Sequence, residues 1–272
     1  MFLAPGVAPF IVSNPMNMIV AEFSGLNFNS YAAVMLPLSV AGAIATYLIL
    51  RVVYRRVRAT AVLGPAAAVT HVARHPAERP AVVLLLAVFF AYPVAASLHV
   101  DIWLIALAGA CGSLVIARAY RVAPARRLLG HVSFDILAFL WGIFLVVQGL
   151  RGVGAVDWLA SIYDGAAFGS GEHLARIGVT SAVGSALIDN HPMSILNMMA
   201  IPHAGDAKPL LAALVGGDIG PRLLPIGSLA GLLWIDLLRR SGIRVSVGQF
   251  FRLGTLVLAP TLALSLWMLW WL

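Results

Sequence analysis

The chain has 272 residues, of which 61% are hydrophobic and only 11% are charged. A soluble domain carries about 25% charged residues, so the composition excludes a soluble globular protein and indicates an all-α polytopic membrane protein. The net charge of +7 does not indicate a nucleic-acid partner, because the arginines cluster in short segments between apolar runs. A single cysteine, Cys111, cannot form a disulfide framework or a thiolate metal cluster by itself.

The first apolar run, residues 7–23, is interrupted by Ser13, Asn14 and Pro15. Proline lacks an amide donor but is tolerated at the first position of a helix, so a helix is expected to restart at Pro15. We interpret the run as a broken spanning helix. The alternative is a surface helix that begins at the proline.

Five later apolar runs have lengths suited to crossing a bilayer. They cover residues 31–53, 81–98, 102–117, 133–150 and 251–272. The last run ends with Trp267, Trp270 and Trp271, a pattern typical of a membrane interface. Residues 1–58 are therefore expected to hold a broken helix and one span, and residues 59–80 a loop.

Residues 155–205 contain apolar arms that are too short or too interrupted to be full crossings. Between the arms lies a polar group formed by Asp189, Asn190 and His191. We expect a re-entrant hairpin with these three residues at its tip inside the membrane. The alternative is two ordinary spans joined by a polar loop.

A second broken helix is predicted over residues 209–238. Residues 215–227 of this run hold four glycines, two prolines, Asp218 and Arg222. Backbone that leaves a helix at membrane depth must be satisfied by protein or by a watery cavity, and transporters build binding sites in this way. The alternative is a kinked helix in an ordinary bundle, with Asp218 and Arg222 paired.

The distribution of basic residues indicates an orientation. Segments 51–80, 118–127 and 239–252 carry 14 arginines, whereas Arg151, Arg176 and Lys208 are expected on the opposite side. Alternate crossings reproduce this bias only if residues 155–205 enter the membrane and return to the same side. The basic segments, including the loop 59–80, are then cytoplasmic, and the C-terminus lies outside.

Three segments resemble the bacterial arsenite permeases, the arsenical pump membrane subunits of the ion transporter superfamily. Gly217-Asp218-Ile-Gly220-Pro221-Arg-Leu-Leu-Pro225-Ile-Gly227-Ser228 resembles the last motif of that family. The run from Ser13 to Ala21 resembles the broken helix of the first repeat, and Phe134 to Leu150 the span before the second hairpin. The likeness covers nearly the whole chain.

The resemblance implies an inverted-repeat transporter in which each repeat is a re-entrant hairpin followed by a broken helix. Residues 81–272 would form the second repeat. This chain has both broken helices but only the second hairpin. We therefore expect a chain that lacks the N-terminal spans and the first hairpin tip of the family pattern.

The same resemblance implies a secondary transporter of the bacterial inner membrane that exports arsenite or antimonite, in exchange for protons. At neutral pH these substrates are mainly neutral trihydroxides, which require hydrogen-bond donors and acceptors rather than a compensating charge. The expected substrate site joins both broken helices and the hairpin tip: Ser13, Asn14, Asn17, Asn190, Asp218, Gly220 and Ser228. Asp189 or Asp218 would carry the proton; the nearby cation Arg222 favours Asp189.

Other functions stay open at this point. The chain could be a sodium-coupled carboxylate or sodium/proton transporter of the same superfamily, or a non-transporting fragment. An intramembrane enzyme using His191 and Asp189 would need a nucleophile or spaced metal ligands, and neither is evident, so we expect no enzyme, metal or cofactor. The expected partners are the lipid bilayer, a soluble ATPase subunit and a second copy of the chain.

Overall fold

The structure is a computed structural model that describes residues 6–55, 75–122, 124, 127, 130, 135–202, 205–227, 229–240, 242 and 245–272. The chain divides into two compact units, one formed by residues 1–58 and 140–272 and the other by residues 59–139. The regular elements within the described residues are all helices, as the composition predicts. The predicted site residue Ser228 and most of the predicted loop 59–80 lie outside the described residues.

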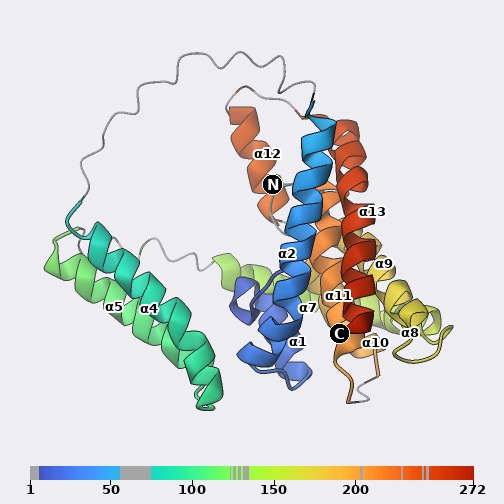
Figure 1. The fold of residues 1–272 in the computed structure, drawn as a ribbon, viewed down its shortest axis with the longest axis horizontal. Coiled ribbons are helices and arrows are strands. Elements are labelled where there is room, and N and C mark those ends of the chain that lie inside the picture. Colours follow the sequence, from blue (N-terminus) through green and yellow to red (C-terminus); the bar gives the residue numbers. More distant parts are fainter. Residues whose placement is uncertain are drawn as a thin grey trace. The chain divides into compact units, whose positions relative to one another are not determined.

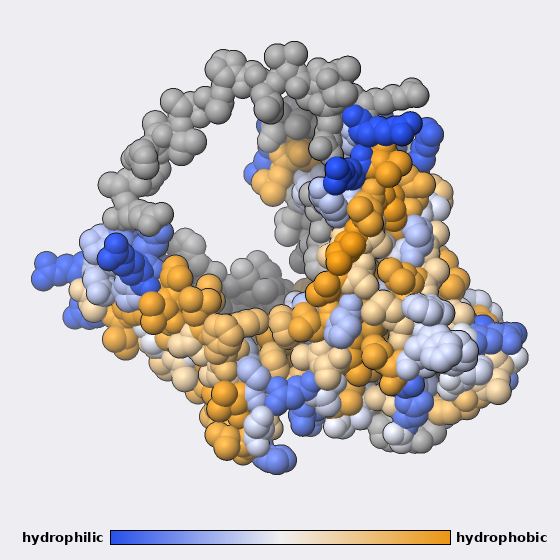
Figure 2. All heavy atoms as spheres, in the orientation of Figure 1, coloured by the Kyte–Doolittle hydropathy of each residue, from blue (hydrophilic) through white to orange (hydrophobic). Residues whose placement is uncertain are grey.

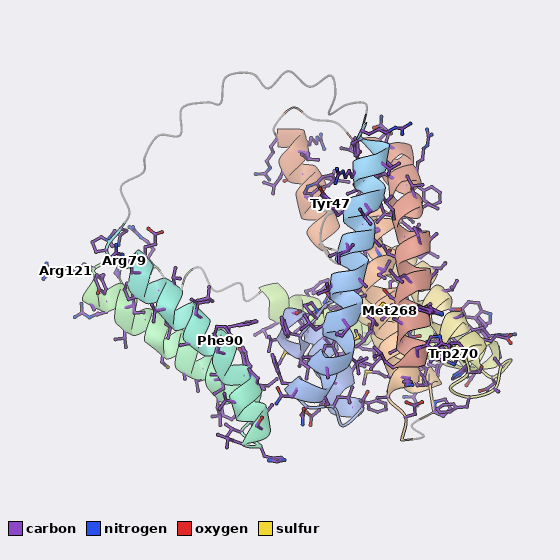
Figure 3. The ribbon with its side chains drawn as sticks, viewed as in Figure 1. Tyr47, Arg79, Phe90, Arg121, Met268 and Trp270 are labelled. Carbon is purple, nitrogen blue, oxygen red and sulfur yellow. The ribbon has the colours of Figure 1, made fainter. Side chains whose placement is uncertain are left out.

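The smaller unit contains an antiparallel pair of helices, α4 (Glu78–Ser97) and α5 (Ile102–Ala119), drawn in Figure 1. Small residues of α5 allow the close approach, because Gly109 faces the side chain of Val88 on α4. The two helices coincide with the runs 81–98 and 102–117 that the sequence predicts as spans. Figure 3 shows Arg79 and Arg121 at the same end of the pair.

The larger unit is built from two short broken segments, a cluster of short helices and two long helices. Its elements are η1 (Ile11–Ser13), α1 (Pro15–Phe23), α2 (Phe28–Val53), α8 (Ala155–Tyr163), α9 (Gly171–Ile188), α10 (Asn190–Ala200), α11 (Lys208–Ile219), η2 (Gly220–Arg222), η3 (Pro225–Gly227), α12 (Leu229–Arg240) and α13 (Val247–Trp271). Most of α7 (Asp135–Gly152) also belongs to it. In Figure 1, α2 and α13 lie side by side, and α13 also contacts α9 and α11.

The long helix α2 carries its large apolar side chains outward. Its exposed face repeats every four residues: Leu36, Val40, Ile44, Leu48 and Val52. Its buried face includes small and polar residues: Ser39, Gly42 and Thr46. Figure 2 shows the resulting apolar stripe along this helix. Such an arrangement is stable only when the outer face contacts lipid and the inner face packs closely on other helices.

Four helices of the described residues are long and apolar enough to cross a membrane: α2, α4, α5 and α13. A fifth crossing is possible where α7 meets α8, but these two helices are bent by 73° at their junction. The runs predicted as spans at 31–53, 81–98, 102–117 and 251–272 are thus helices with the length and apolar composition of a membrane span. The bend after the run 133–150 was not predicted from the sequence, although Gly154 at the junction has a φ of +83°.

The second broken helix is interrupted where the prolines and glycines predict. α11 ends at Ile219, two short 3₁₀ turns follow, and α12 begins at Leu229. Gly216, Gly220 and Gly227 lie so close to α9 that a Cβ would collide with its backbone at Gly178, Ala182 and Ser185, respectively. The glycines therefore let the backbone of the broken segment touch the backbone of α9.

Two neighbouring glycines provide a matched test of this packing. At Gly216 an added methyl group meets the carbonyl oxygen of Gly178, whereas at Gly217 its nearest contact is an ordinary 3.5 Å to Ser185. We expect Gly216→Ala to cost about 1–3 kcal/mol of stability or to prevent folding, because backbone cannot yield as a flexible side chain does. Gly217→Ala should keep wild-type stability. Thermal unfolding of both purified variants in detergent measures the difference, and equal melting would contradict the packing.

Candidate functional site

The first broken segment contributes a capped helix start. Asn14 is extended, with φ −153° and ψ 140°, and its side chain accepts a hydrogen bond from the amide of Met16 at 3.0 Å. Pro15 is the first residue of α1, as predicted. The hydroxyl of Ser13 is exposed and accepts from the amide of Phe10 at 3.3 Å. The side-chain oxygens of Ser13 and Asn14 are thus both engaged with nearby backbone.

Asn17 lies one turn further along α1 and is completely buried. Neither its Nδ2 nor its Oδ1 has a hydrogen-bond partner among the described residues. The helix that carries it contacts α10 and α11. Burying an amide without partners is costly, and such groups in native structures usually meet water or a ligand.

Asp218 connects the second broken segment to the first. Its Oδ2 accepts a hydrogen bond from the backbone amide of Ala8 at 2.8 Å. The carbonyl of the same residue, Ala8, accepts from the hydroxyl of Tyr31 on α2 at 3.3 Å. Gly6 lies against Ile219 and Arg222. Residues 6–8 therefore run along the end of α11, and the peptide group of Ala8 is held from both sides.

Arg222 is also buried, with 5% of its surface exposed. Its Nη1 lies 3.4 Å from the hydroxyls of Thr46 on α2 and Thr261 on α13. The structure thus directs Asp218 toward Ala8 and Arg222 toward the two threonines. The backbone carbonyl oxygen of Arg222 lies so close to Gly254 of α13 that a side chain at Gly254 could not fit.

The predicted hairpin tip is the junction of α9 and α10. Asp189 has a φ of +77° and caps α10 by accepting from the amide of His191 at 2.9 Å. A second contact of 2.6 Å joins its Oδ1 to Nδ1 of His191. The imidazole of His191 also interacts electrostatically with Asp218.

Asn190 is the third residue of this tip, and 8% of its surface is exposed. Its Oδ1 has no partner among the described residues, and neither has Oγ of Ser185, one turn before the tip on α9. Three hydroxyls, those of Ser181, Ser185 and Ser194, lie within 3.7 Å of the position that a Cβ of Gly217 would take. Polar groups therefore gather where α9, α10 and α11 meet.

Beside these groups lies a fully satisfied network. The hydroxyl of Tyr163 donates to Asn197 Oδ1 at 2.6 Å, and Asn197 Nδ2 donates to Ser181 at 3.0 Å. The hydroxyl of Ser181 in turn donates to the carbonyl of Ala213 at 2.6 Å. The chain of bonds joins α8, α10, α9 and α11. Such networks rigidify the elements that they connect.

A cavity of about 410 Å³ borders the hairpin, but its lining is almost entirely apolar. It lies between α8, α9 and α10 and includes Trp158, Leu159 and Leu196. A polyhydroxylated solute needs donors and acceptors, which this cavity does not supply. The polar groups around Asn17, Asp218 and the hairpin tip therefore define the candidate site.

The structure brings together only part of the predicted site. Asn17 belongs to α1, which contacts α10, the helix that starts at Asn190, and α11, the helix that carries Asp218. Gly220 instead packs on the α9 backbone at Ala182. Tyr31 and the serines of α9 were not predicted as site residues, because nothing local in the sequence marks contacts 16 or more residues apart.

The family model described as arsenical pump membrane protein matches residues 2–272 of the chain. The arsenical pump membrane protein of Escherichia coli K12 is 31% identical over 270 residues, and that of Yersinia enterocolitica 32% over 276 residues. A putative arsenical pump membrane protein of Bacillus subtilis is 25% identical over 292 residues. These alignments cover 95%, 95% and 97% of this chain.

The same alignments cover only 62%, 62% and 66% of the three relatives. The chain therefore spans less than two thirds of the length of the curated relatives that it matches. No solved structure matches the chain.

The buried network predicts a large effect for a small change. Tyr163→Phe removes one hydroxyl and leaves Asn197 Oδ1 without its donor, which should cost about 1–3 kcal/mol. Tyr47→Phe is the control, because Tyr47 is half exposed on the lipid-facing side of α2. Thermal unfolding of the purified variants measures both. A Tyr163→Phe protein that melts with the Tyr47→Phe control would show that the network contributes nothing.

Proposed function

The chain belongs to the arsenical pump membrane protein family, and from this premise we propose that it exports arsenite or antimonite from the cytoplasm in exchange for protons. The observation that carries the proposal is the buried amide of Asn17, whose donor and acceptor both lack partners among the described residues. A neutral trihydroxide offers both a hydrogen-bond donor and an acceptor at each hydroxyl. The amide of Asn17 can therefore bind such a solute without a compensating charge.

The remaining contacts of the substrate come from the predicted site. Asn190 contributes an unpartnered Oδ1 at the tip, and Asp218 contributes the carboxylate oxygen that does not hold Ala8. Ser13, Asn14, Gly220 and Ser228 stay part of the proposed binding region. In the free protein, the first two have their oxygens engaged with nearby backbone.

Proton coupling is assigned to Asp218 and Asp189, and His191 contacts Asp189 at 2.6 Å. The bond from Ala8 to an ionised Asp218 is charge-assisted, and protonation replaces it with a neutral bond of about half the strength. Binding of a proton therefore loosens residues 6–8 from the end of α11. Release of that proton restores the contact, so the charge state of one carboxylate is linked to the position of the first broken segment.

The orientation proposed for the chain follows from its basic ends. In the larger unit, Arg55 near the end of α2, Arg240 at the end of α12 and Arg252 at the start of α13 belong to one end. Trp270, which Figure 3 shows near the other end of α13, accepts a bond from Lys208. We place the arginine-rich end on the cytoplasmic side of a bacterial inner membrane and the C-terminus on the outer side.

A soluble ATPase subunit would dock on the cytoplasmic end, and a second copy of the chain is a further proposed partner.

Arsenite transport is tested most directly in a chimera, because the chain spans 62% of the Escherichia coli relative. The matching part of that relative is replaced by this chain, and the chimera is expressed in a bacterium that lacks arsenite efflux. We expect arsenite resistance and low cellular arsenic. Sensitivity equal to that of the empty vector, with the chimera present in the membrane, would contradict the proposed function.

Asn17→Leu separates binding from stability in this chimera. Leucine has a similar volume but no polar atoms, so we expect stability to be kept or raised by up to about 3 kcal/mol while transport falls about tenfold or more. Met16→Leu, at the neighbouring buried position, is the control and should leave both unchanged. Transport is measured as arsenite uptake into everted vesicles, and unfolding temperature reports stability. Normal uptake by Asn17→Leu would remove Asn17 from the site.

The proton assignment is tested in the same vesicles with an imposed pH gradient. Asp218→Asn can still accept the bond from Ala8, but it cannot exchange a proton. We expect both Asp218→Asn and Asp189→Asn to abolish the effect of the gradient on arsenite uptake. Asp236→Asn, which alters an exposed ion pair with Arg240, should keep the effect. Gradient-driven uptake in the Asp218→Asn and Asp189→Asn variants would contradict the assignment.

A further inference from the structure

A groove of about 570 Å³ opens at the arginine-rich end of the larger unit. It lies between the end of α2, the helix α12 and the first turns of α13. Its lining includes Trp234, Gln249, Phe250, Arg252, Leu253 and Leu256. None of these residues belongs to the candidate transport site, so the groove is distinct from that site.

The groove combines an apolar interior with a polar rim. Phe250 is almost fully buried and contacts the ring of Trp234 at a centroid distance of 6.4 Å. Leu256 is half exposed, and it continues the groove onto the lipid-facing surface of α13. Arg252 and Gln249 supply the polar side. An acyl chain can therefore enter sideways from the bilayer while a headgroup stays at the rim.

The charge around the groove is strongly positive. Within residues 51–58 and 239–252, the part that the structure describes carries five arginines and no acidic residue: Arg51, Arg55, Arg239, Arg240 and Arg252. The nearest acid in sequence, Asp236, pairs with Arg240 at 2.7 Å. Figure 2 shows the hydrophilic residues gathered at this end, above the apolar stripe of α2. Such a rim favours an anionic group over a zwitterionic one.

We propose that this groove binds one anionic phospholipid, with an acyl chain on Phe250, Leu253 and Leu256 and the phosphate at Arg252. The apolar lining and the basic rim match the two halves of that molecule. A water-soluble partner could not occupy the part of the groove that continues onto the lipid-facing surface. The proposal does not depend on which solute the protein transports.

Native mass spectrometry of the detergent-purified protein tests the site. The probes are phosphatidylglycerol and phosphatidylcholine with identical acyl chains. We expect phosphatidylglycerol to be retained about fivefold more than phosphatidylcholine, the preference that one basic residue near the membrane surface gives. Arg252→Gln should lower this preference, because the other arginines of the rim remain, and Arg252→Lys should restore most of it.

Two further variants separate charge from shape. Arg151→Gln, which changes an exposed arginine of α7 outside the groove, should leave the retention of both lipids unchanged. Leu253→Trp fills the groove and should lower the retention of both lipids. Equal retention of the two lipids by the wild type, or an unchanged preference in Arg252→Gln, would overturn the proposal. A dimer that Leu253→Trp dissociates, without retained lipid, would assign the groove to a second copy of the chain instead.

Discussion

Close backbone contact between α9 and the segment from α11 to η3 determines where the groups of the candidate site lie. Within lipid, helices gain little by burying apolar surface against one another, because the lipid tails are equally apolar. Their association therefore depends on close packing. Gly216 and Gly220 place one face of the broken segment directly on α9. Asp218, about 200° around the helix from Gly216, consequently projects to the other side, where Ala8 meets it. The glycines that bring the backbones together thus also orient the carboxylate.

Satisfied and unsatisfied polar groups lie next to each other in this region, and the contrast is informative. The bonds from Tyr163 through Asn197 and Ser181 to Ala213 fix four helices to one another. Asn17, on a helix that contacts two of these four, has an amide with no partner among the described residues. A rigid frame that presents unsatisfied donors and acceptors is suited to bind a ligand, because the packing of the frame already holds these groups in position.

The local features of the fold were predictable from the sequence, and the long-range ones were not. Proline and glycine act on their own backbone, so Pro15 marked the start of α1 and Pro221 lies in the break after α11. Apolar runs likewise marked four candidate spans, because hydropathy is also a local property of the sequence. The contact of Asp218 with Ala8 joins residues 210 positions apart, and no local pattern in the sequence around either residue predicts it. The bend between α7 and α8 lies beside Gly154, whose φ of +83° favours glycine, but the prediction from the sequence did not use this residue.

The helices of the larger unit differ in length and polarity, and this difference affects the order in which they insert into the membrane. α2 and α13 are long and apolar enough to be recognised by the insertion machinery independently, with their outer faces already suited to lipid. α10 and α11 have only 11 and 12 residues and carry or adjoin Asp189, Asn190, His191 and Asp218. Such short polar helices cannot partition into a bilayer unaided, since their backbone ends would be unsatisfied there. They must enter against helices already in place, so the part of the protein that forms the candidate site is the last to assemble.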